Sequence, residues 1–191
     1  GLKMRIPGLG AEIINQLGGT AINLPPGEIM PALQQGVIDA TEWVGPWVDK
    51  ISGLHKIAKY YYGPGIHEPG TANELIMNKE AWDKLPNNLK EIIKNACYTI
   101  YLESMGEFLY YNSLSLEELR TKYNIKVQNF DKKIIKKMFE IARDVVESFS
   151  EQGNIHKRIY LSWLDSLNKF NKYQLFSDYG YINERMNHVK Y

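Results

Sequence analysis

Arg5 is the residue whose type and position point most directly to binding chemistry. It is the only arginine before Arg120, and it lies at the carboxyl end of a short run, Lys3 to Ile6, that is typical of a β-strand. In an open α/β sheet, ligands bind at the carboxyl ends of the strands. A guanidinium forms two parallel hydrogen bonds to a carboxylate, which a lysine cannot reproduce. Position alone leaves two roles open for Arg5, binding a ligand carboxylate or forming a structural salt bridge.

Glu42 and Glu68 are candidate metal ligands, because both follow predicted strands. Glu42 directly precedes Trp43 after the third strand, and Glu68 belongs to the run His67-Glu68-Pro69-Gly70. If the two carboxylates met, their like charges would require a shared proton or a bridging cation. Ligands that are all oxygen favour a hard ion such as Na⁺, Ca²⁺ or Mg²⁺ over zinc. A surface position or a helix cap is the alternative role for Glu42.

Other familiar cofactor and catalytic motifs are incomplete in this sequence. Gly8-Leu9-Gly10 lies between a strand and a helix, but the dinucleotide fingerprint needs a third glycine where this chain has Ile13. The free backbone N–H groups of that turn could still bind a carboxylate. The single cysteine, Cys97, excludes an intrachain disulfide and a cysteine-based zinc site. The histidines show no metal-ligand spacing, and only His67, beside Glu68, is a candidate general base.

The composition is that of a globular protein, since 44% of the 191 residues are hydrophobic and 24% are charged. Lys and Arg number 23 and Asp and Glu number 22, so the net charge is +1 and nothing suggests a nucleic-acid or membrane-surface binder. No apolar run approaches the length of about 20 residues that spans a bilayer. The chain begins with neither Met nor a signal-like segment, and we expect it to be a fragment.

The N-terminal part alternates between strand and helix patterns, which predicts an α/β fold. Strands are expected over residues 3–6, 20–24 and 37–41, and helices over residues 11–17 and 28–35. Strands and short helices that alternate in this way are typical of one sheet unit. Arg5, at the carboxyl end of the first strand, and Glu42, after the third strand, are therefore expected at the same edge of the sheet.

The rest of the chain is predicted to be mostly helical after residue 78. The helix that follows Asp131 carries one apolar stripe and a lysine-rich face, which is typical of a solvated surface rather than a phosphate-binding track. The elements expected are, in chain order, a helix over 47–58 with a break at Ser52-Gly53, strands over 60–62 and 71–77, a long helix from Pro86 to about 112, a further helix opened by a Ser115–Glu118 capping box, a strand over 125–130, the helix capped by Asp131, and a last helix over 155–176.

Three parts of the sequence together resemble a known family. They are the start Gly1-Leu2-Lys3-Met4-Arg5, the run Asp39-Ala40-Thr41-Glu42-Trp43-Val44-Gly45-Pro46, and Lys59-Tyr60-Tyr61-Tyr62 with His67-Glu68-Pro69-Gly70. These parts closely resemble the solute-binding proteins of tripartite ATP-independent periplasmic (TRAP) transporters. More narrowly, they resemble the DctP-type branch, which binds 2-oxo and 2-hydroxy monocarboxylates together with a metal ion. The resemblance is dense as far as about Leu85 and continues as a helical pattern to about Ser177.

The resemblance implies a role for each matching residue. Arg5 matches the arginine that fixes the ligand carboxylate. Glu42 matches a carboxylate metal ligand, and Trp43 matches a residue that gives its backbone carbonyl to the ion and its ring to the pocket. Glu68 matches the position of a further metal ligand. The ion in such sites is Na⁺ or Ca²⁺, bridged by the carboxylate of the bound acid and by its 2-oxo or 2-hydroxyl oxygen.

The resemblance also implies the second lobe of a two-lobe periplasmic binding protein (type II-like), with long bracing helices. Residues 1–70 would form the ligand-binding second lobe. Residues 71–153 would contribute the hinge strand, the long bracing helix and elements that complete the first lobe. Residues 154–191 would form a C-terminal helix and tail, with residues 155–176 as a homodimer interface. The first lobe, with its signal peptide and its side-chain amide ligand, is missing from this chain.

The implied function is that of a periplasmic receptor that performs no chemistry. It would capture a small monocarboxylate with a metal ion and deliver it to the TRAP membrane permease subunits. The alternative from the residues is a metal-dependent lyase or isomerase acting on 2-oxo acids, with a cation at Glu42 and Glu68 as Lewis acid and His67 as base. Met30 stands where the family often has an aromatic residue, and Trp47 replaces a usual tyrosine, so the shape of the pocket and the preferred acid are expected to differ.

Overall fold

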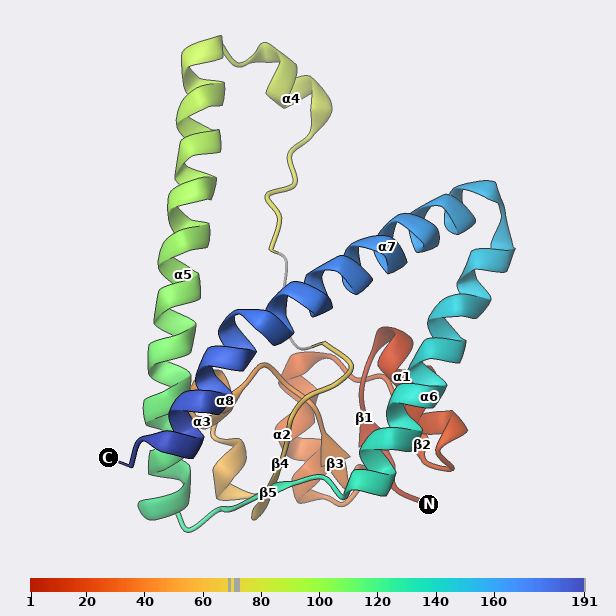
Figure 1. Cartoon of the computed structure of the whole chain (residues 1–191), viewed down its shortest axis with the longest axis vertical. Helices are drawn as coiled ribbons and strands as arrows, with labels where there is room; N and C mark the ends of the chain where they lie inside the picture. The colour runs from red at the N-terminus through yellow and green to blue at the C-terminus, as the bar shows by residue number, and fades with distance from the viewer. Residues whose placement is uncertain (69, 71–72, 191) are drawn as a thin grey trace. The chain divides into compact units, whose positions relative to one another are not determined.

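The computed structural model describes residues 1–68, 70 and 73–190 of the chain (Figure 1). It contains two compact units, residues 1–139 and residues 140–191. The candidate site lies within the first unit. Among the described residues, no helix is both long enough and apolar enough to cross a membrane.

The first sheet confirms the predicted α/β alternation. Its strands are β1 (Lys3–Arg5), β2 (Thr20–Ile22) and β3 (Ala40–Thr41), all parallel and in the order β2-β1-β3. Because β1 is the central strand, its last residue pairs on both sides, with Ile22 and with Thr41. The residue that follows Thr41 is therefore placed beside Arg5.

Two short helices connect these strands, α1 (Gly8–Gln16) and α2 (Pro26–Gln34). The two glycines in the first turn of α1 have different roles. Gly10 allows close packing, because a Cβ there would lie 2.6 Å from the side chain of Ile6. Gly8 has a φ of +60°, which glycine adopts without strain. The apolar core under α2 consists of Ile29, Ala32 and Ile38, covered by the partly buried side chains of Ile22, Leu24, Leu33, Trp43 and Leu54.

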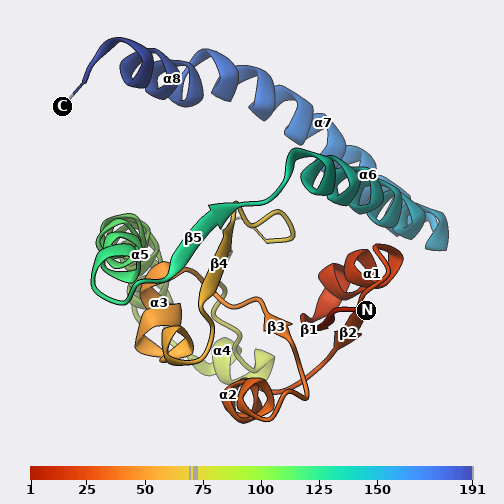
Figure 2. The ribbon, with the colours of Figure 1, turned by 90° about the horizontal axis from the view of Figure 1, so that it is seen from below.

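The rest of the first unit follows β3. It contains α3 (Pro46–Ile51), a 3₁₀ turn η1 (Leu54–Lys56), strand β4 (Tyr60–Gly63), helices α4 (Lys79–Lys84) and α5 (Asn87–Thr121), and strand β5 (Lys126–Asn129). Strands β4 and β5 pair in parallel, with Tyr60 opposite Lys126. Figures 1 and 2 both show α3 lying against α5. The contact includes the ring of Trp47, which stacks on Tyr111 at 4.7 Å between ring centroids.

Two sequence predictions in this region are wrong, and one is confirmed. Residues 73–77 form no strand, because no strand among the described residues pairs with them; residues 71 and 72 of the expected strand lie outside the described part. Ser115 opens no new helix, because α5 continues through it and buries it at 1% exposure. The predicted break after α3 is present, since Gly53 adopts a left-handed φ of +80°.

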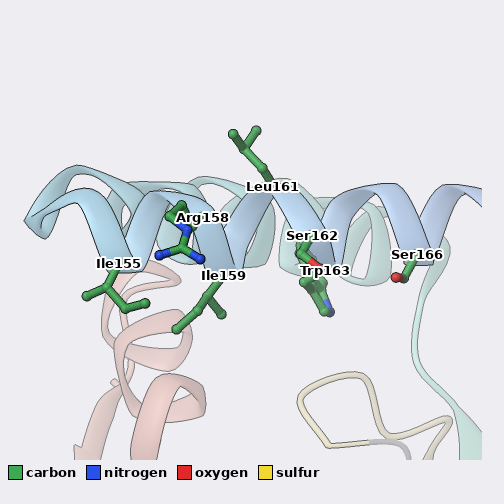
Figure 3. Close-up of a pocket in the computed structure, with 7 residues that line it drawn as sticks. All are labelled: Ile155, Arg158, Ile159, Leu161, Ser162, Trp163 and Ser166. Atoms are coloured by element: carbon green, nitrogen blue, oxygen red, sulfur yellow. The ribbon is translucent and has the colours of Figure 1, made fainter.

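Helix α6 (Lys132–Phe149) begins as predicted. The Oδ1 atom of Asp131 accepts a hydrogen bond from the Lys133 N–H at 2.7 Å, which caps the first turn. The chain continues through the 3₁₀ turn η2 (Ser150–Gln152), helix α7 (Asn154–Phe176) and helix α8 (Asp178–His188). Figure 3 shows a shallow hollow on the second unit, residues 140–191. The side chains that line it all come from α7, among them Ile155, Ile159 and Trp163.

Candidate functional site

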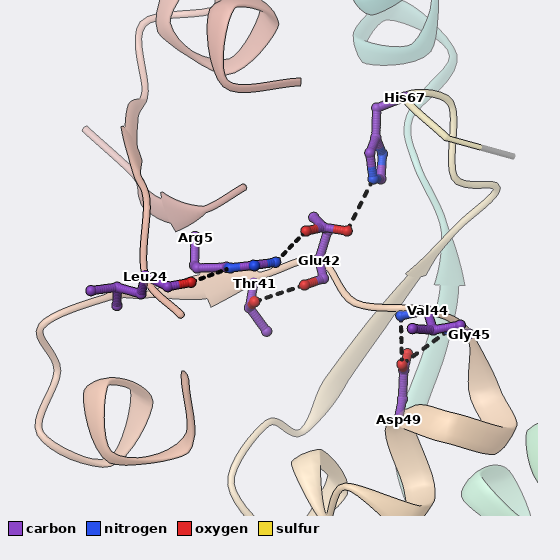
Figure 4. A network of polar contacts seen from close by, with 8 residues as sticks. All are labelled: Arg5, Leu24, Thr41, Glu42, Val44, Gly45, Asp49 and His67. Atoms are coloured by element: carbon purple, nitrogen blue, oxygen red, sulfur yellow. Dashed lines mark hydrogen bonds and ion pairs between the residues drawn. The ribbon is translucent and has the colours of Figure 1, made fainter. Parts of the chain in front are cut away.

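Arg5 lies buried at the carboxyl end of β1 and contacts three groups. Its Nη1 donates to Oε1 of Glu42 at 2.6 Å, and its Nε donates to the Leu24 carbonyl at 3.1 Å (Figure 4). The guanidinium carbon also lies 5.5 Å from the centre of the Trp43 ring. These contacts use Nε and Nη1, so within the described residues Nη2 is the nitrogen left for an anion.

Glu42 is placed beside Arg5 by the parallel pairing of β3 with β1. Its backbone N–H donates to the Arg5 carbonyl at 3.2 Å, which continues the strand ladder by one residue. Thr41 donates from its hydroxyl to the Glu42 carbonyl at 2.8 Å. The second carboxylate oxygen of Glu42 lies 3.2 Å from Nε2 of His67. Both oxygens of a nearly buried carboxylate are therefore held in place.

Trp43 forms the boundary between this polar pair and the apolar core. Its ring packs against the core cluster, while its indole Nε1 is buried with no hydrogen-bond partner among the described residues. Within those residues the Trp43 carbonyl also accepts no hydrogen bond. Buried polar groups are usually paired, so the indole Nε1–H is a candidate donor to a ligand or water. The unpaired carbonyl oxygen is a candidate acceptor for water or donor to an ion.

Asp49 is a third buried charged group, and sequence reasoning missed it. Its Oδ1 accepts from the N–H groups of Val44 and Gly45 at 3.1 and 3.0 Å, and its Oδ2 accepts from the Tyr61 hydroxyl at 2.7 Å. Burial raises the pKa of Asp49, and burial together with the nearby Asp49 raises the pKa of Tyr61. The signal in the sequence is an acidic residue in the first turn of a helix that begins at Pro46, directly after Gly45.

Helix α5 fixes the position of α3, which carries Asp49. The side-chain oxygen of Asn112 accepts a hydrogen bond from the Trp47 N–H at 2.9 Å, in the first turn of α3. Lys50 forms an ion pair with Glu118 at 2.6 Å, and this contact lowers the pKa of Glu118. Two contacts across more than 60 residues of sequence therefore hold the helix that follows the Glu42–Trp43 segment.

Glu68 is exposed, and within the described residues no hydrogen bond or ion pair joins it to Glu42. The neighbouring His67 makes the contact with Glu42 instead. In the part of the chain that the structure describes, no three His, Cys, Asp or Glu side chains are grouped so that they could hold a metal ion. The structure therefore brings together Arg5, Glu42, Trp43 and His67, and leaves Glu68 apart from them.

The donor set nevertheless fits a hard cation in part. The Glu42 carboxylate and the Trp43 carbonyl are consecutive oxygen donors, the type that Na⁺ and Ca²⁺ take. Because Ca²⁺ takes about six to eight oxygen ligands, these two donors can form only one side of such a site. The remaining ligands would come from a bound acid, from water and from other parts of the protein.

Comparison with known proteins agrees with this arrangement. Residues 1–152 match the family of bacterial extracellular solute-binding proteins, family 7 (DctP). The chain belongs to this family. The predicted resemblance is thereby confirmed. A monocarboxylate 2-oxoacid-binding periplasmic protein from Nostoc sp. is 37% identical over 163 residues, which cover 85% of this chain and 44% of that relative.

Solved structures of TRAP periplasmic solute-binding proteins show the same fold. A TRAP periplasmic solute-binding protein from Colwellia psychrerythraea, with bound calcium and pyruvate, matches with a TM-score of 0.90 and 33% identity. One from Pseudoalteromonas atlantica, with bound sodium and pyruvate, matches with a TM-score of 0.89 and 32% identity. Each match covers 96% of this chain and 56% of the other. This DctP chain thus spans about half the length of the relatives it matches.

Proposed function

We propose that this chain forms the carboxylate-binding part of the periplasmic receptor of a TRAP transporter. The receptor captures a small 2-oxo or 2-hydroxy monocarboxylate together with Na⁺ or Ca²⁺ and delivers it to the membrane permease subunits. The observation that carries the proposal is the buried contact between Arg5 and Glu42 at the sheet edge, with Trp43 beside both. Relatives that share this fold bind pyruvate with sodium or with calcium.

Each residue of the site has a distinct role in this proposal. Arg5 binds the carboxylate of the acid, with Nη2 directed at it and Glu42 holding the guanidinium in place. Glu42 and the Trp43 carbonyl bind the ion from one side, and Glu68 approaches as a further ligand. The bound ion supplies positive charge to the carboxylate and to the 2-oxo or 2-hydroxyl oxygen of the acid. The ring of Trp43 closes the apolar side of the pocket.

The receptor performs no chemistry, and its response to the bound acid is closure of the ligand-binding cleft. A bound acid stabilises the closed state because it contacts groups on both sides of the cleft only when the cleft is shut. A permease that recognises the closed state then receives only loaded receptor. We further propose that residues 155–176 pair two copies of the protein. A relative from Bordetella bronchiseptica, with calcium and picolinate bound, was solved as a dimer of mixed occupancy.

A tryptophan-fluorescence titration with pyruvate tests this function in the complete polypeptide that carries these residues. We expect a saturable change, because Trp43 lies in the pocket wall. Removal of Ca²⁺ with a chelator, followed by removal of Na⁺, should abolish the change at one of the two steps. A change that survives both removals would contradict the metal site. Absence of any change with pyruvate, lactate and longer 2-oxo acids would contradict the receptor proposal, as would turnover of any of them.

A further inference from the structure

The hydrogen bond between Val44 and Asp49 determines the orientation of a group on the preceding residue. The N–H of Val44 and the carbonyl of Trp43 belong to one peptide unit, which is trans. In a planar trans peptide the N–H and the C=O point in opposite directions. Because the Val44 N–H is directed at Asp49 at 3.1 Å, the Trp43 carbonyl is directed away from Asp49.

The direction of this carbonyl matters because of where Glu42 lies. In the view of Figure 4, the carboxylates of Glu42 and Asp49 lie on opposite sides of the segment that joins β3 to α3. The Trp43 carbonyl, which points away from Asp49, therefore also points away from α3. Within the described residues it accepts no hydrogen bond. An ion bound by Glu42 requires its second donor to be oriented in this way.

We infer that Asp49 is a positioning residue of the metal site, which holds the Trp43 carbonyl in the orientation that binds the ion. This inference rests on the proposed function. Asp49 does not touch the ion; it acts through the backbone of Val44 and Gly45. Groups that orient metal ligands in this way typically change metal affinity when they are mutated.

Asp49 is itself held rigidly, as a positioning residue must be. It is 7% exposed, and each of its carboxylate oxygens accepts at least one hydrogen bond. The Tyr61 hydroxyl donates to its Oδ2 from β4, while Oδ1 faces the two backbone N–H groups. Asn112 caps the same helix from α5. Rotation of the Trp43–Val44 peptide would break the Val44 bond and leave a buried carboxylate with one donor fewer.

The test uses Tb³⁺ as a luminescent substitute for Ca²⁺ in the complete polypeptide. Excitation of tryptophan reports binding, and decay times in H₂O and D₂O give the number of water molecules on the ion. In Asp49→Ala we expect Tb³⁺ affinity to fall roughly 10- to 100-fold. We also expect about one additional coordinated water, because water replaces a misdirected carbonyl oxygen. A purely structural role would not change the water count.

Two further variants complete the test. Asp49→Asn should behave as wild type within about threefold, because its side-chain oxygen still accepts from both backbone N–H groups. Asp39→Ala is the matched control: Asp39 also accepts a backbone hydrogen bond, from the Lys3 N–H at 2.8 Å, but at the other end of β1. It should leave both affinity and water count unchanged.

Several outcomes would overturn the inference. One is an Asp49→Ala variant with wild-type affinity and water count, and another is an Asp49→Asn variant as defective as Asp49→Ala. If Asp49→Ala does not fold, Asp49→Leu replaces it, because leucine keeps the side-chain volume without an acceptor. A wild-type protein that binds no Tb³⁺ would overturn the proposed metal site itself, which distinguishes that failure from a failure of the role of Asp49 alone.

Discussion

The guanidinium of Arg5 and the carboxylate of Glu42 lie 2.6 Å apart, with only 7% and 11% of their side chains exposed. Removing one partner of a buried ion pair leaves the other charge without compensation, which typically costs about 3–5 kcal/mol. A ligand carboxylate that approaches Arg5 therefore meets a cation already fixed in direction. The same contact holds the Glu42 carboxylate in a fixed orientation beside the proposed ion position, so the two halves of the site stabilise each other.

Replacing Arg5 with Lys should separate binding from stability. The ammonium keeps a positive charge beside Glu42, but it cannot form two parallel bonds to a carboxylate. We expect pyruvate affinity, measured by calorimetry, to fall at least about tenfold, which is 1.4 kcal/mol, while the unfolding temperature falls less than in Glu42→Gln, because a cation still faces Glu42. Arg143→Lys is the control, because Arg143 forms only an exposed pair with Asp144. Unchanged pyruvate affinity in Arg5→Lys would contradict the role of Arg5.

Replacing Glu42 with Gln should affect both metal binding and stability. The amide keeps the shape but removes the anion, so Ca²⁺ affinity falls, and Arg5 loses the partner of its buried charge, at a cost of about 3–5 kcal/mol. Calorimetry with Ca²⁺ and urea unfolding measure the two effects. Glu118→Gln, which removes an exposed partner of Lys50, should have little effect on stability and none on Ca²⁺ affinity. If Glu68→Gln leaves Ca²⁺ affinity unchanged, Glu68 is not a ligand.

His55 should make the stability of the protein depend on pH. Burial lowers its pKa below the ordinary value of 6.5, with further lowering by Lys56, Lys59 and Lys50. The folded state therefore favours the neutral ring, so the contribution is present above pH 6.5 and is lost as the pH falls. We expect His55→Phe to lose less unfolding free energy than wild type between about pH 7 and pH 5. His188→Phe, at an exposed position, should follow wild type.

Replacing Asn112 with Ala should loosen α3 without altering the ligands. The variant removes the acceptor of the Trp47 N–H, and loss of a cap of this kind costs about 1 kcal/mol. Urea unfolding measures this cost, and Asn95→Ala, at an exposed position on the same long helix, provides the control. A variant as stable as wild type would mean that water replaces the cap. Ca²⁺ affinity should fall less than in Glu42→Gln.

Much of the fold could be predicted from local sequence alone. Alternating strand and helix patterns separated by glycine and proline turns predicted β1, α1, β2, α2 and β3. Because the carboxyl ends of parallel strands meet at one edge, the same pattern placed Arg5 and Glu42 together. Asp131 was likewise predicted as a helix cap from its neighbours in sequence. The strand, helix and cap signals depend on residues within one or two turns of one another, whereas the pairing of Arg5 with Glu42, 37 residues apart, follows from the parallel order of the strands.

The tertiary structure decided which groups complete the site. Sequence reasoning expected Glu68 near Glu42, whereas the loop after β4 presents His67 to that carboxylate. It predicted a new helix at Ser115, but packing buries that serine inside α5. The bond of Asp49 to Tyr61 and the bond of Trp47 to Asn112 likewise join groups 12 and 65 residues apart, and only packing selects such pairs. Residue types determine which contacts are chemically possible, but the free energy of burying the whole core determines which are made.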